Sequence, residues 1–324
     1  MSYIKIVALL FLTIVASPIQ AEIPYSFDCL LDHKPAVQGF SYSTFENSME
    51  WKRDKTDEEF FSDKDVKAVK QNYANFCRNF EFMPKQDYSA APAKCSIPQI
   101  VHLIWLGSEV SKKVASAFNS WKTHHPHWEI KIWTDKELAI YEWSNAKVQL
   151  AFSQAVTWAE KADILRLELL YKFGGIYSDA DVVCTNSFQD LIVQDVGFFS
   201  AFELNYIGKH YGEPFFIGSA VMGAAKNSHV VKYCLDNLQT EEEAPTVGII
   251  KRTGPGLISR ACQAVLANQK ENILILPCSY LYPLPWKLRD VTSETVADFL
   301  SSETLAIHLW DGSWCTHKKK KAQK

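Results

Sequence analysis

The stretch ADILRLELLYKFGGIYSDADVV, which runs from Ala162 to Val183, predicts more about the fold than any other part of the chain. Its apolar residues recur at helical spacing as far as Phe173, which favours a buried helix. The pair Gly174–Gly175 supplies the backbone freedom that ends a helix. Ile176 and Tyr177 then have room only for a short strand, so the stretch predicts a helix, a stop, a strand and an acidic turn.

The predicted strand delivers two carboxylates to its end, Asp179 and Asp181, with the small Ala180 between them. Two carboxylates one residue apart can reach the same hard divalent cation, directly or through water, and a diphosphate can fill the remaining positions. Mn²⁺ or Mg²⁺ suits such a set of carboxylate and phosphate oxygens. We therefore expect Asp179 and Asp181 to be metal ligands and catalytic residues.

Asp163 and Arg166 precede this turn, on the predicted helix. Their i, i+3 spacing places them on one face, where the plain interpretation is a helical ion pair that contributes a few tenths of a kcal/mol. The functional interpretation is that Arg166 offers hydrogen-bond donors, and Asp163 an acceptor, to a bound ligand. The spacing alone leaves both interpretations open.

Taken together, these residues resemble the signature of the DXD sugar transferases of glycosyltransferase family 32, which includes α-mannosyl-, α-galactosyl- and α-N-acetylglucosaminyltransferases. The large glucosylating toxins are more distantly similar. The resemblance implies a GT-A-like α/β fold, in which a single Rossmann-type nucleotide-sugar-binding domain has a mostly parallel sheet flanked by helices. It also implies metal-dependent, retaining transfer of a hexose from a UDP- or GDP-sugar to a hydroxyl of a glycan, glycolipid or protein. The residues that carry the resemblance are Asp163, Arg166, Gly174, Gly175, Tyr177, Asp179 and Asp181.

An upstream segment, IPQIVHLIWLG at residues 97–107, is similar to the opening of the same transferases. Its β-branched and aromatic residues follow a proline and end in glycine, which predicts a buried strand. Ligands of open α/β sheets bind at the carboxyl ends of strands. The resemblance implies that Trp105 and Leu106 frame the nucleotide base, although core packing is the alternative for Trp105. His102 is interpreted as a histidine of the core or of the layer behind the site.

A downstream segment, LAIHLWDGSW at residues 305–314, resembles the closing pattern of these transferases. By strand alternation alone, His308 would be a core histidine. The resemblance instead implies that His308 and Ser313 complete the shell around the metal and the diphosphate, with Trp314 as a lid over the donor. The metal candidates are then Asp179, Asp181 and His308, and the catalytic candidates are Asp179, Asp181 and Arg166. The donor-binding candidates are Trp105, Leu106, Asp163, Arg166, Tyr177, Ala180, Ser313 and Trp314.

Elsewhere the chain alternates between strand and helix patterns. Residues 97–107, 128–133 and 196–202 predict strands, whereas residues 111–124 and 147–173 predict helices. This alternation is typical of a parallel sheet with helical crossovers. It agrees with the α/β class that the resemblance implies.

The domain organisation is expected to have four parts. Residues 1–21 have the layout of a secretory signal peptide, with an uncleaved signal anchor as the alternative and the sole route to a membrane. Residues 22–95 are an N-terminal helical extension with a linker, residues 96–317 the transferase domain, and residues 318–324 a basic tail. Because sugar nucleotides are made in the cytosol, export implies an endoplasmic reticulum or Golgi lumen, or a secreted effector.

Composition limits the partners. The 324 residues are 47% hydrophobic, which suffices for a buried core, and the net charge of −3 gives no overall indication of nucleic-acid binding. The eight cysteines predict some disulfides in an exported chain, with their pairing open. The partners that the resemblance implies are a nucleotide-sugar donor and a carbohydrate or protein acceptor, and no nucleic acid is expected.

Two other functions compete with sugar transfer. The pattern from Asp179 to Val183 also fits the strand-end motif of haloacid-dehalogenase-like phosphatases, in which the first aspartate is the nucleophile. That family usually has its motif on the first strand of the core, whereas several predicted elements precede Asp179 here. The second alternative is a carbohydrate-binding protein without turnover, which the complete set of acidic and basic residues disfavours.

Overall fold

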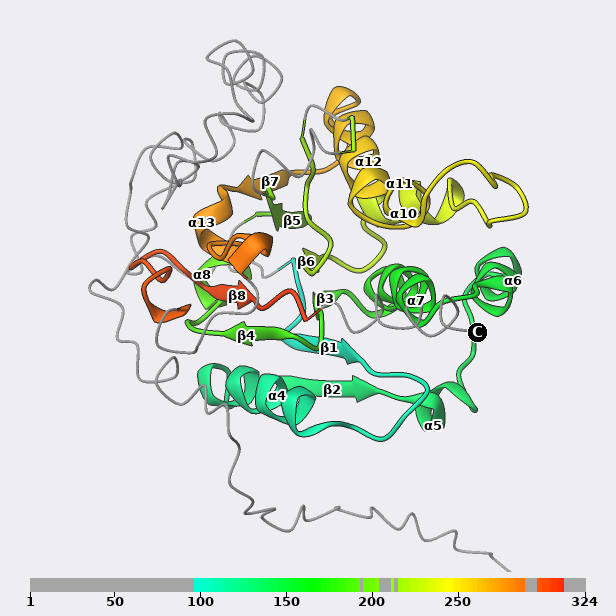
Figure 1. The fold of residues 1–324 in the computed structure, drawn as a ribbon. Coiled ribbons are helices and arrows are strands. Elements are labelled where there is room, and N and C mark those ends of the chain that lie inside the picture. Colours follow the sequence, from blue (N-terminus) through cyan, green and yellow to red (C-terminus); the bar gives the residue numbers. More distant parts are fainter. Residues whose placement is uncertain (1–95, 193–194, 204–210, 213–214, 289–295, 312–324) are drawn as a thin grey trace, which may run out of the picture.

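The computed structural model describes residues 96–311, with gaps at 193–194, 204–210, 213–214 and 289–295 (Figure 1). The predicted signal peptide, the N-terminal extension, the basic tail, Ser313 and Trp314 lie outside the described residues, so these expectations stay predictions. Within the described part, no helix combines the length and the apolar character needed to cross a bilayer.

A six-stranded mixed sheet forms the centre of the fold. Its strand order is β2-β1-β3-β6-β5-β7, and every neighbouring pair is parallel except the two pairs that involve β6. The predicted α/β class with a mostly parallel sheet is therefore confirmed, and β6 alone runs against the other strands. The strands are β1 (Ile100–Ile104), β2 (Glu129–Trp133), β3 (Gly175–Ser178), β5 (Phe198–Ala201), β6 (Val221–Ala224) and β7 (Ile273–Leu276).

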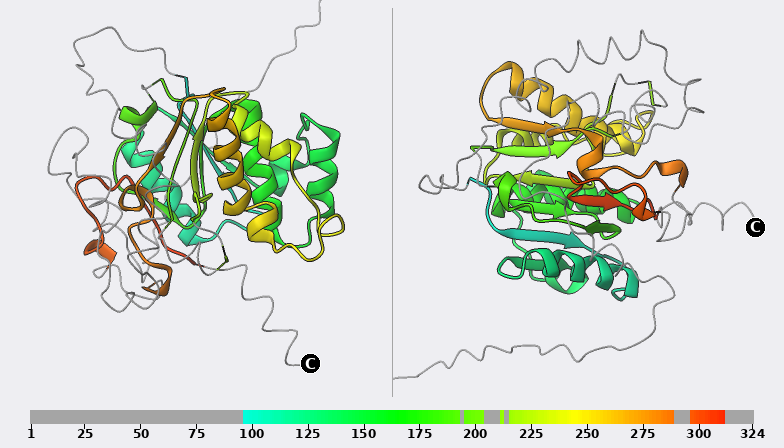
Figure 2. Two further views of the ribbon diagram at one scale, coloured as in Figure 1. Left: turned by 90° about the horizontal axis from the view of Figure 1, so that it is seen from above. Right: turned by 90° about the vertical axis from the view of Figure 1, so that its left-hand side faces the viewer.

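Helices cover both faces of this sheet. The longest, α7, packs against β1, β3 and β6 and also against α10, which in turn packs against α12. These three helices lie on one side, and α4 lies on the other (Figure 2). The helices are α4 (Lys112–His124), α5 (Asp135–Leu138), α6 (Ala146–Gln154), α7 (Trp158–Phe173), α8 (Gln189–Ile192), α10 (His229–Asp236), α11 (Ile249–Arg252), α12 (Pro255–Ala267) and α13 (Cys278–Leu281), with a 3-10 helix η2 (Trp286–Leu288).

A second sheet has two antiparallel strands, β4 (Val182–Cys184) and β8 (Ala306–His308). In their register Val182 pairs with His308. The sheet thus joins the residues that follow the acidic turn to a segment near the end of the described chain. The sequence pattern predicted β8 as a strand but gave no indication of its partner.

The single helix predicted for residues 147–173 is wrong, because α6 and α7 are separate helices. The chain leaves helical geometry at Ala155, whose N–H still donates to the Ala151 carbonyl oxygen. Thr157 then caps α7, its side-chain oxygen accepting from the Glu160 N–H at 3.1 Å. The β-branched pair Val156–Thr157 and this cap explain a break that contains neither glycine nor proline.

The Gly174–Gly175 pair ends α7 and begins β3, as predicted. Gly174 has φ of 68° and Gly175 has φ of 98°, both in the region that favours glycine. The buried His102 holds this turn in place. Its Nδ1 accepts a hydrogen bond from the Trp133 indole N–H at 3.1 Å. Nε2 therefore carries the proton, which it donates to the Gly174 carbonyl oxygen at 2.9 Å. His102 is therefore a core histidine, and burial lowers its pKa to about 4.

We expect Gly175→Ala to destabilise the protein by at least about 2 kcal/mol. A Cβ at this position would lie 2.5 Å from the Ile100 carbonyl oxygen, and the φ of 98° is strained for alanine. Urea unfolding measures the change. Gly248→Ala is the matched control, because nothing lies within 4 Å of the added methyl group, and it should change stability by less than about 1 kcal/mol. Equal stability of both variants would contradict this account of the turn.

Four cysteines of the described chain are buried thiols that form no disulfide: Cys184, Cys234, Cys262 and Cys278. Burial raises the pKa of the Cys278 thiol to about 12, so it stays protonated. The predicted disulfides therefore do not involve these residues. The other cysteines, Cys29, Cys77, Cys95 and Cys315, lie outside the described residues.

Candidate active site

The acidic turn lies at the carboxyl end of β3, as predicted. The Asp179 N–H donates to the Ala220 carbonyl oxygen at 2.7 Å, just before β6 begins, and the Asp179 carbonyl oxygen accepts from the Val182 N–H at 3.2 Å. The chain therefore reverses between β3 and β4 with Ala180 at the tip. Both carboxylates remain on this turn, and their side chains are 27% and 20% exposed at Asp179 and Asp181.

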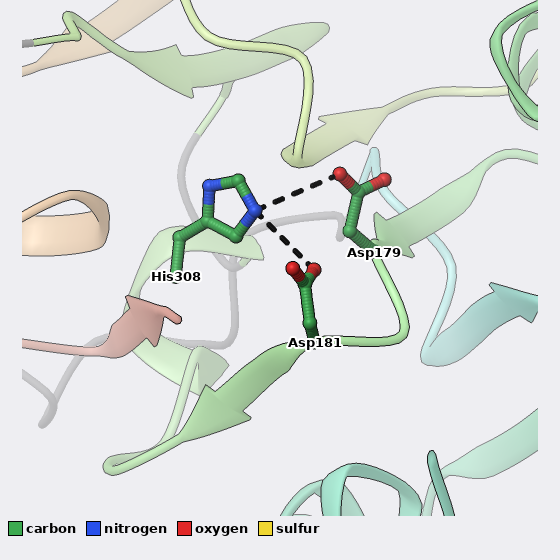
Figure 3. A group of neighbouring side chains, drawn as sticks. All are labelled: Asp179, Asp181 and His308. Atoms are coloured by element: carbon green, nitrogen blue, oxygen red, sulfur yellow. Dashed lines mark ion pairs between the residues drawn. The ribbon is translucent and has the colours of Figure 1, made fainter. Parts of the chain in front are cut away.

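His308 completes a cluster with the two carboxylates (Figure 3). Its Nε2 lies 3.2 Å from Asp181 Oδ1 and 4.0 Å from Asp179 Oδ2. The three candidate ligand atoms lie within 4.8 Å of one another. The residues proposed as metal ligands from the sequence thus converge, although β4 and β8 that bring them together belong to distant parts of the chain.

Each carboxylate has one oxygen occupied by the protein. Asp179 Oδ1 accepts from the Tyr177 hydroxyl at 2.5 Å and lies 3.4 Å from Arg166 Nη1, which leaves Oδ2 on the side of His308. Asp181 Oδ2 accepts from the Asp311 backbone N–H at 2.8 Å, which leaves Oδ1 on the side of His308. The remaining oxygens therefore face a common point, as ligands of one cation must.

The segment after β8 secures Asp181. The Leu309 N–H donates to the Asp181 carbonyl oxygen at 3.0 Å. Trp310 has φ of 53°, so the chain turns at this residue, and its ring packs against His308 with centroids 4.1 Å apart. Lys113 then pairs with Asp311 Oδ1 at 2.5 Å, which ties the segment to the start of α4. Neither Lys113 nor Asp311 was a predicted site residue, and their separation of 198 residues left no local signal.

The charges of the cluster are unbalanced. Burial and the neighbouring Asp181 raise the pKa of Asp179, although Arg166 and His308 oppose the change. Burial also acts to raise the pKa of Asp181, but His308 together with hydrogen bonds from the backbone lowers it overall. The pKa of His308 rises in return, although its burial opposes the rise. With Asp163 and Glu203 included, carboxylates outnumber the two cationic groups, Arg166 and His308. A bound divalent cation would favour the ionised form of these carboxyls and the neutral form of His308, and two carboxylates with an imidazole would then supply oxygen and nitrogen ligands for Mn²⁺.

Arg166 links the two acidic regions. Its Nη2 pairs with Asp163 Oδ1, and its Nη1 donates to the Ser219 carbonyl oxygen at 2.6 Å. The guanidinium lies 4.7 Å from the centre of the Tyr177 ring, and Arg166 is only 5% exposed. The i, i+3 ion pair of the plain interpretation is therefore present, and it is buried. Most N–H groups of Arg166 bond to the protein, so contact between Arg166 and a nucleotide-sugar donor stays a prediction.

The candidates for the nucleotide base lie at the end of β1. Trp105 is partly exposed, and its indole N–H donates to the Glu109 carbonyl oxygen at 2.9 Å, within its own loop. Leu106 is buried in the core. The strand-end position of Trp105 agrees with the sequence, and its role in base binding is untested.

Glu203 follows β5 and is a further carboxylate of this region, only 7% exposed. Burial raises its pKa to about 7; nearby His308 opposes this shift, and Asp179 adds to it. The electrostatic influence of these two residues indicates that Glu203 lies on the side of the metal candidates.

We expect Glu203→Gln to stabilise the metal-free protein at pH 8. A carboxyl whose pKa rises from 4.5 to about 7 on folding binds its proton more tightly in the folded state, so stability falls as pH rises between these values. The shift corresponds to roughly 3 kcal/mol above pH 7. Urea unfolding at pH 4 and pH 8 should show the gain only at pH 8. Glu241→Gln, at an exposed position, is the control, and a gain that is equal at both pH values would contradict the assignment.

Comparison with known proteins supports the interpretation of the acidic turn. Residues 111–198 match the family described as "Glycosyltransferase sugar-binding region containing DXD motif". The chain carries this sugar-binding region. Asp179-Ala180-Asp181 is its DXD motif, and the resemblance stated from the sequence is confirmed.

Several relatives of the chain are glycosyltransferases by name. The chain is 33% identical over 98 residues to inositol phosphoceramide mannosyltransferase 3 of Schizosaccharomyces pombe, which covers 30% of this chain and 28% of that protein. It is 26% identical over 162 residues to lactosylceramide 4-alpha-galactosyltransferase of Rattus norvegicus, which covers 46% and 40%. The matches thus span less than half of the length of these relatives.

Solved structures of glycosyltransferases are also similar. The PaToxG glycosyltransferase has a TM-score of 0.45 at 17% identity, covering 64% of this chain and 79% of that chain. The catalytic domain of the alpha-toxin from Clostridium novyi has a TM-score of 0.45 at 10% identity, covering 95% and 98%.

Proposed function

We propose that the chain is a metal-dependent glycosyltransferase that moves a hexose from a UDP- or GDP-sugar to a hydroxyl acceptor, with retention of the anomeric configuration. The observation that carries the proposal is the convergence of one oxygen each from Asp179 and Asp181 with Nε2 of His308. These residues would hold Mn²⁺ or Mg²⁺. A bound divalent cation would neutralise the charge that develops on the departing diphosphate.

The protein's own residues prepare this position. Tyr177 and Arg166 fix one oxygen of Asp179, and the Asp311 N–H fixes one oxygen of Asp181, so neither carboxylate must reorganise when a cation arrives. We assign Asp163 to sugar or ribose hydroxyls, Trp105 and Leu106 to the base, and Ala180, Ser313 and Trp314 to the donor. A retaining reaction needs either a carboxylate nucleophile or front-face attack by the acceptor. Glu203 is the candidate for the first route, and both routes stay open.

We infer the class of acceptor from the names of the relatives. Inositol phosphoceramide and lactosylceramide appear in the names of the yeast and rat proteins, so we place a glycolipid hydroxyl before a glycan or protein hydroxyl. The secretory route expected from residues 1–21 remains a prediction, because these residues lie outside the described part of the chain.

A panel of UDP- and GDP-hexoses tests the function. The purified chain is incubated with each donor and a glycolipid acceptor, with Mn²⁺ or with a chelator, and nucleoside diphosphate release is measured. We expect release with one donor class, loss of release with the chelator, and an α-linked product from an α-linked donor by NMR. Release of phosphate from a phosphomonoester would favour the phosphatase. Calorimetric binding of a donor without turnover would favour the carbohydrate-binding alternative.

A further inference from the structure

A buried polar contact joins the turn between α11 and α12 to the face of α7 that carries the site residues. Arg252 Nη2 pairs with Glu160 Oε1 at 2.6 Å, and the Thr253 hydroxyl donates to Asp163 Oδ2 at 2.7 Å. The last residue of α11 and the residue after it thus bind two residues spaced i, i+3 on α7. All four are at most 7% exposed, so water does not compete for these contacts.

Asp163 is the shared member of a longer series of contacts. Its Oδ2 accepts from Thr253, and its Oδ1 pairs with Arg166. Arg166 in turn reaches the Ser219 carbonyl oxygen and Asp179 Oδ1. The series Thr253–Asp163–Arg166–Asp179 therefore leads from the α11–α12 turn to the first aspartate of the DXD motif.

The Thr253 hydroxyl determines how the Asp163 carboxylate is oriented. Because both oxygens of the Asp163 carboxylate have partners, the orientation of its plane is fixed. The hydroxyl also lies 3.2 Å from the Ile249 carbonyl oxygen, but its single proton favours the shorter bond to a charged acceptor. Without the hydroxyl, Oδ2 would be a buried acceptor without a partner, and the carboxylate would turn toward another donor.

The turn itself is built to hold Thr253 in place. Pro255 stands at the first position of α12, where its fixed φ suits a helix start, and Gly254 precedes it as the N-cap. A Cβ on Gly256 would lie 2.9 Å from the Lys251 Cα, so α11 and α12 approach closely here. The Arg252–Glu160 pair anchors the residue before Thr253. The hydroxyl therefore approaches α7 from a constrained direction.

We propose that Thr253 is a positioning residue for the transfer reaction, which acts through Asp163 and Arg166 on the orientation of Asp179. The inference rests on the proposed function. The Thr253 hydroxyl contacts Asp163 and the Ile249 carbonyl oxygen rather than the metal candidates. Its effect is to hold Asp163 in the orientation that keeps the Arg166 guanidinium beside the DXD motif.

Thr253→Val and Thr253→Ser test this role. Valine keeps the shape but removes the hydroxyl, and serine keeps the hydroxyl. We expect Thr253→Val to lower kcat/KM for the donor by about 10- to 100-fold, mostly in kcat, because a misplaced group far from the reacting bond has effects of this size. Thr253→Ser should stay within about threefold of the parent. Thr123→Val removes an exposed hydroxyl on α4 that donates to the Asn119 carbonyl oxygen, and it should leave turnover unchanged.

A double-mutant cycle separates positioning from a general loss of structure. In the Asp163→Asn background, Thr253→Val should lower kcat/KM by less than about twofold more. The contact between Thr253 and residue 163 is already altered in that background. Losses that multiply across the two sites, or a Thr253→Ser variant as poor as Thr253→Val, would overturn the proposal. If the unchanged chain turns over no donor, the proposed function fails. The positioning is then tested by Mn²⁺ affinity alone, which should weaken about three- to tenfold in Thr253→Val and stay constant in Thr253→Ser.

Discussion

Replacing Asp181 by asparagine is expected to lower nucleoside diphosphate release by about 100- to 1,000-fold and to weaken Mn²⁺ binding by more than about tenfold. Asparagine has the same shape, and its amide oxygen can still accept from the Asp311 N–H that now binds Oδ2. The amide nitrogen then replaces the oxygen that lies 3.2 Å from His308 Nε2. The cluster loses a ligand and a negative charge together, while the turn between β3 and β4 keeps its hydrogen bonds.

Asp179→Asn should have a similar effect on release, since Asp179 Oδ2 faces the same point. Asp236→Asn is the matched control, because Asp236 pairs with Lys232 on the surface of α10 and its side chain is 53% exposed. Circular dichroism and a thermal scan confirm that each variant is folded before release is compared. Turnover at the parent level in both DXD variants would remove the metal assignment.

The local part of the site could be predicted from the sequence. Phe173, the glycine pair and the residues up to Asp181 form a continuous stretch, in which spacing alone predicts a helix end, a short strand and an acidic turn. The i, i+3 relation of Asp163 and Arg166 is also local, and the structure shows it as a buried ion pair. These features depend on backbone geometry over a few residues, which the residue types largely determine.

The contacts that complete the site could not be predicted, because they join distant segments. The Asp311 N–H reaches Asp181 across 130 residues, and Thr253 reaches Asp163 across 90. Strand alternation alone placed His308 in the core, whereas the resemblance named it with the two aspartates, and the antiparallel pairing of β8 with β4 brings its imidazole to the acidic turn. A helix pattern also continued through Val156, where the Thr157 cap divides two helices. Tertiary packing decides such features, and a single sequence does not display it.

Replacing Arg166 by leucine is expected to destabilise the protein by about 3–5 kcal/mol at pH 8, the usual effect of removing one partner of a buried ion pair. The guanidinium is only 5% exposed and stands between Asp163 and Asp179. Burial raises the pKa of both carboxyls, and Arg166 opposes that rise at each of them. Without Arg166 their pKa values increase further, so the folded state holds two buried carboxylates with little compensation.

The pH dependence distinguishes this cause from lost packing. A carboxyl with a raised pKa in the folded state destabilises that state above its unfolded pKa of about 4 and has no effect once both states are protonated. The deficit of Arg166→Leu in urea unfolding should therefore be largest near pH 8 and shrink toward pH 4. Arg260→Leu, whose exposed guanidinium donates to the Lys251 carbonyl oxygen at 2.7 Å, should lose less than about 1 kcal/mol at either pH. A deficit for Arg166→Leu that is independent of pH would show that the guanidinium acts through packing, and that the charges of Asp163 and Asp179 do not depend on it.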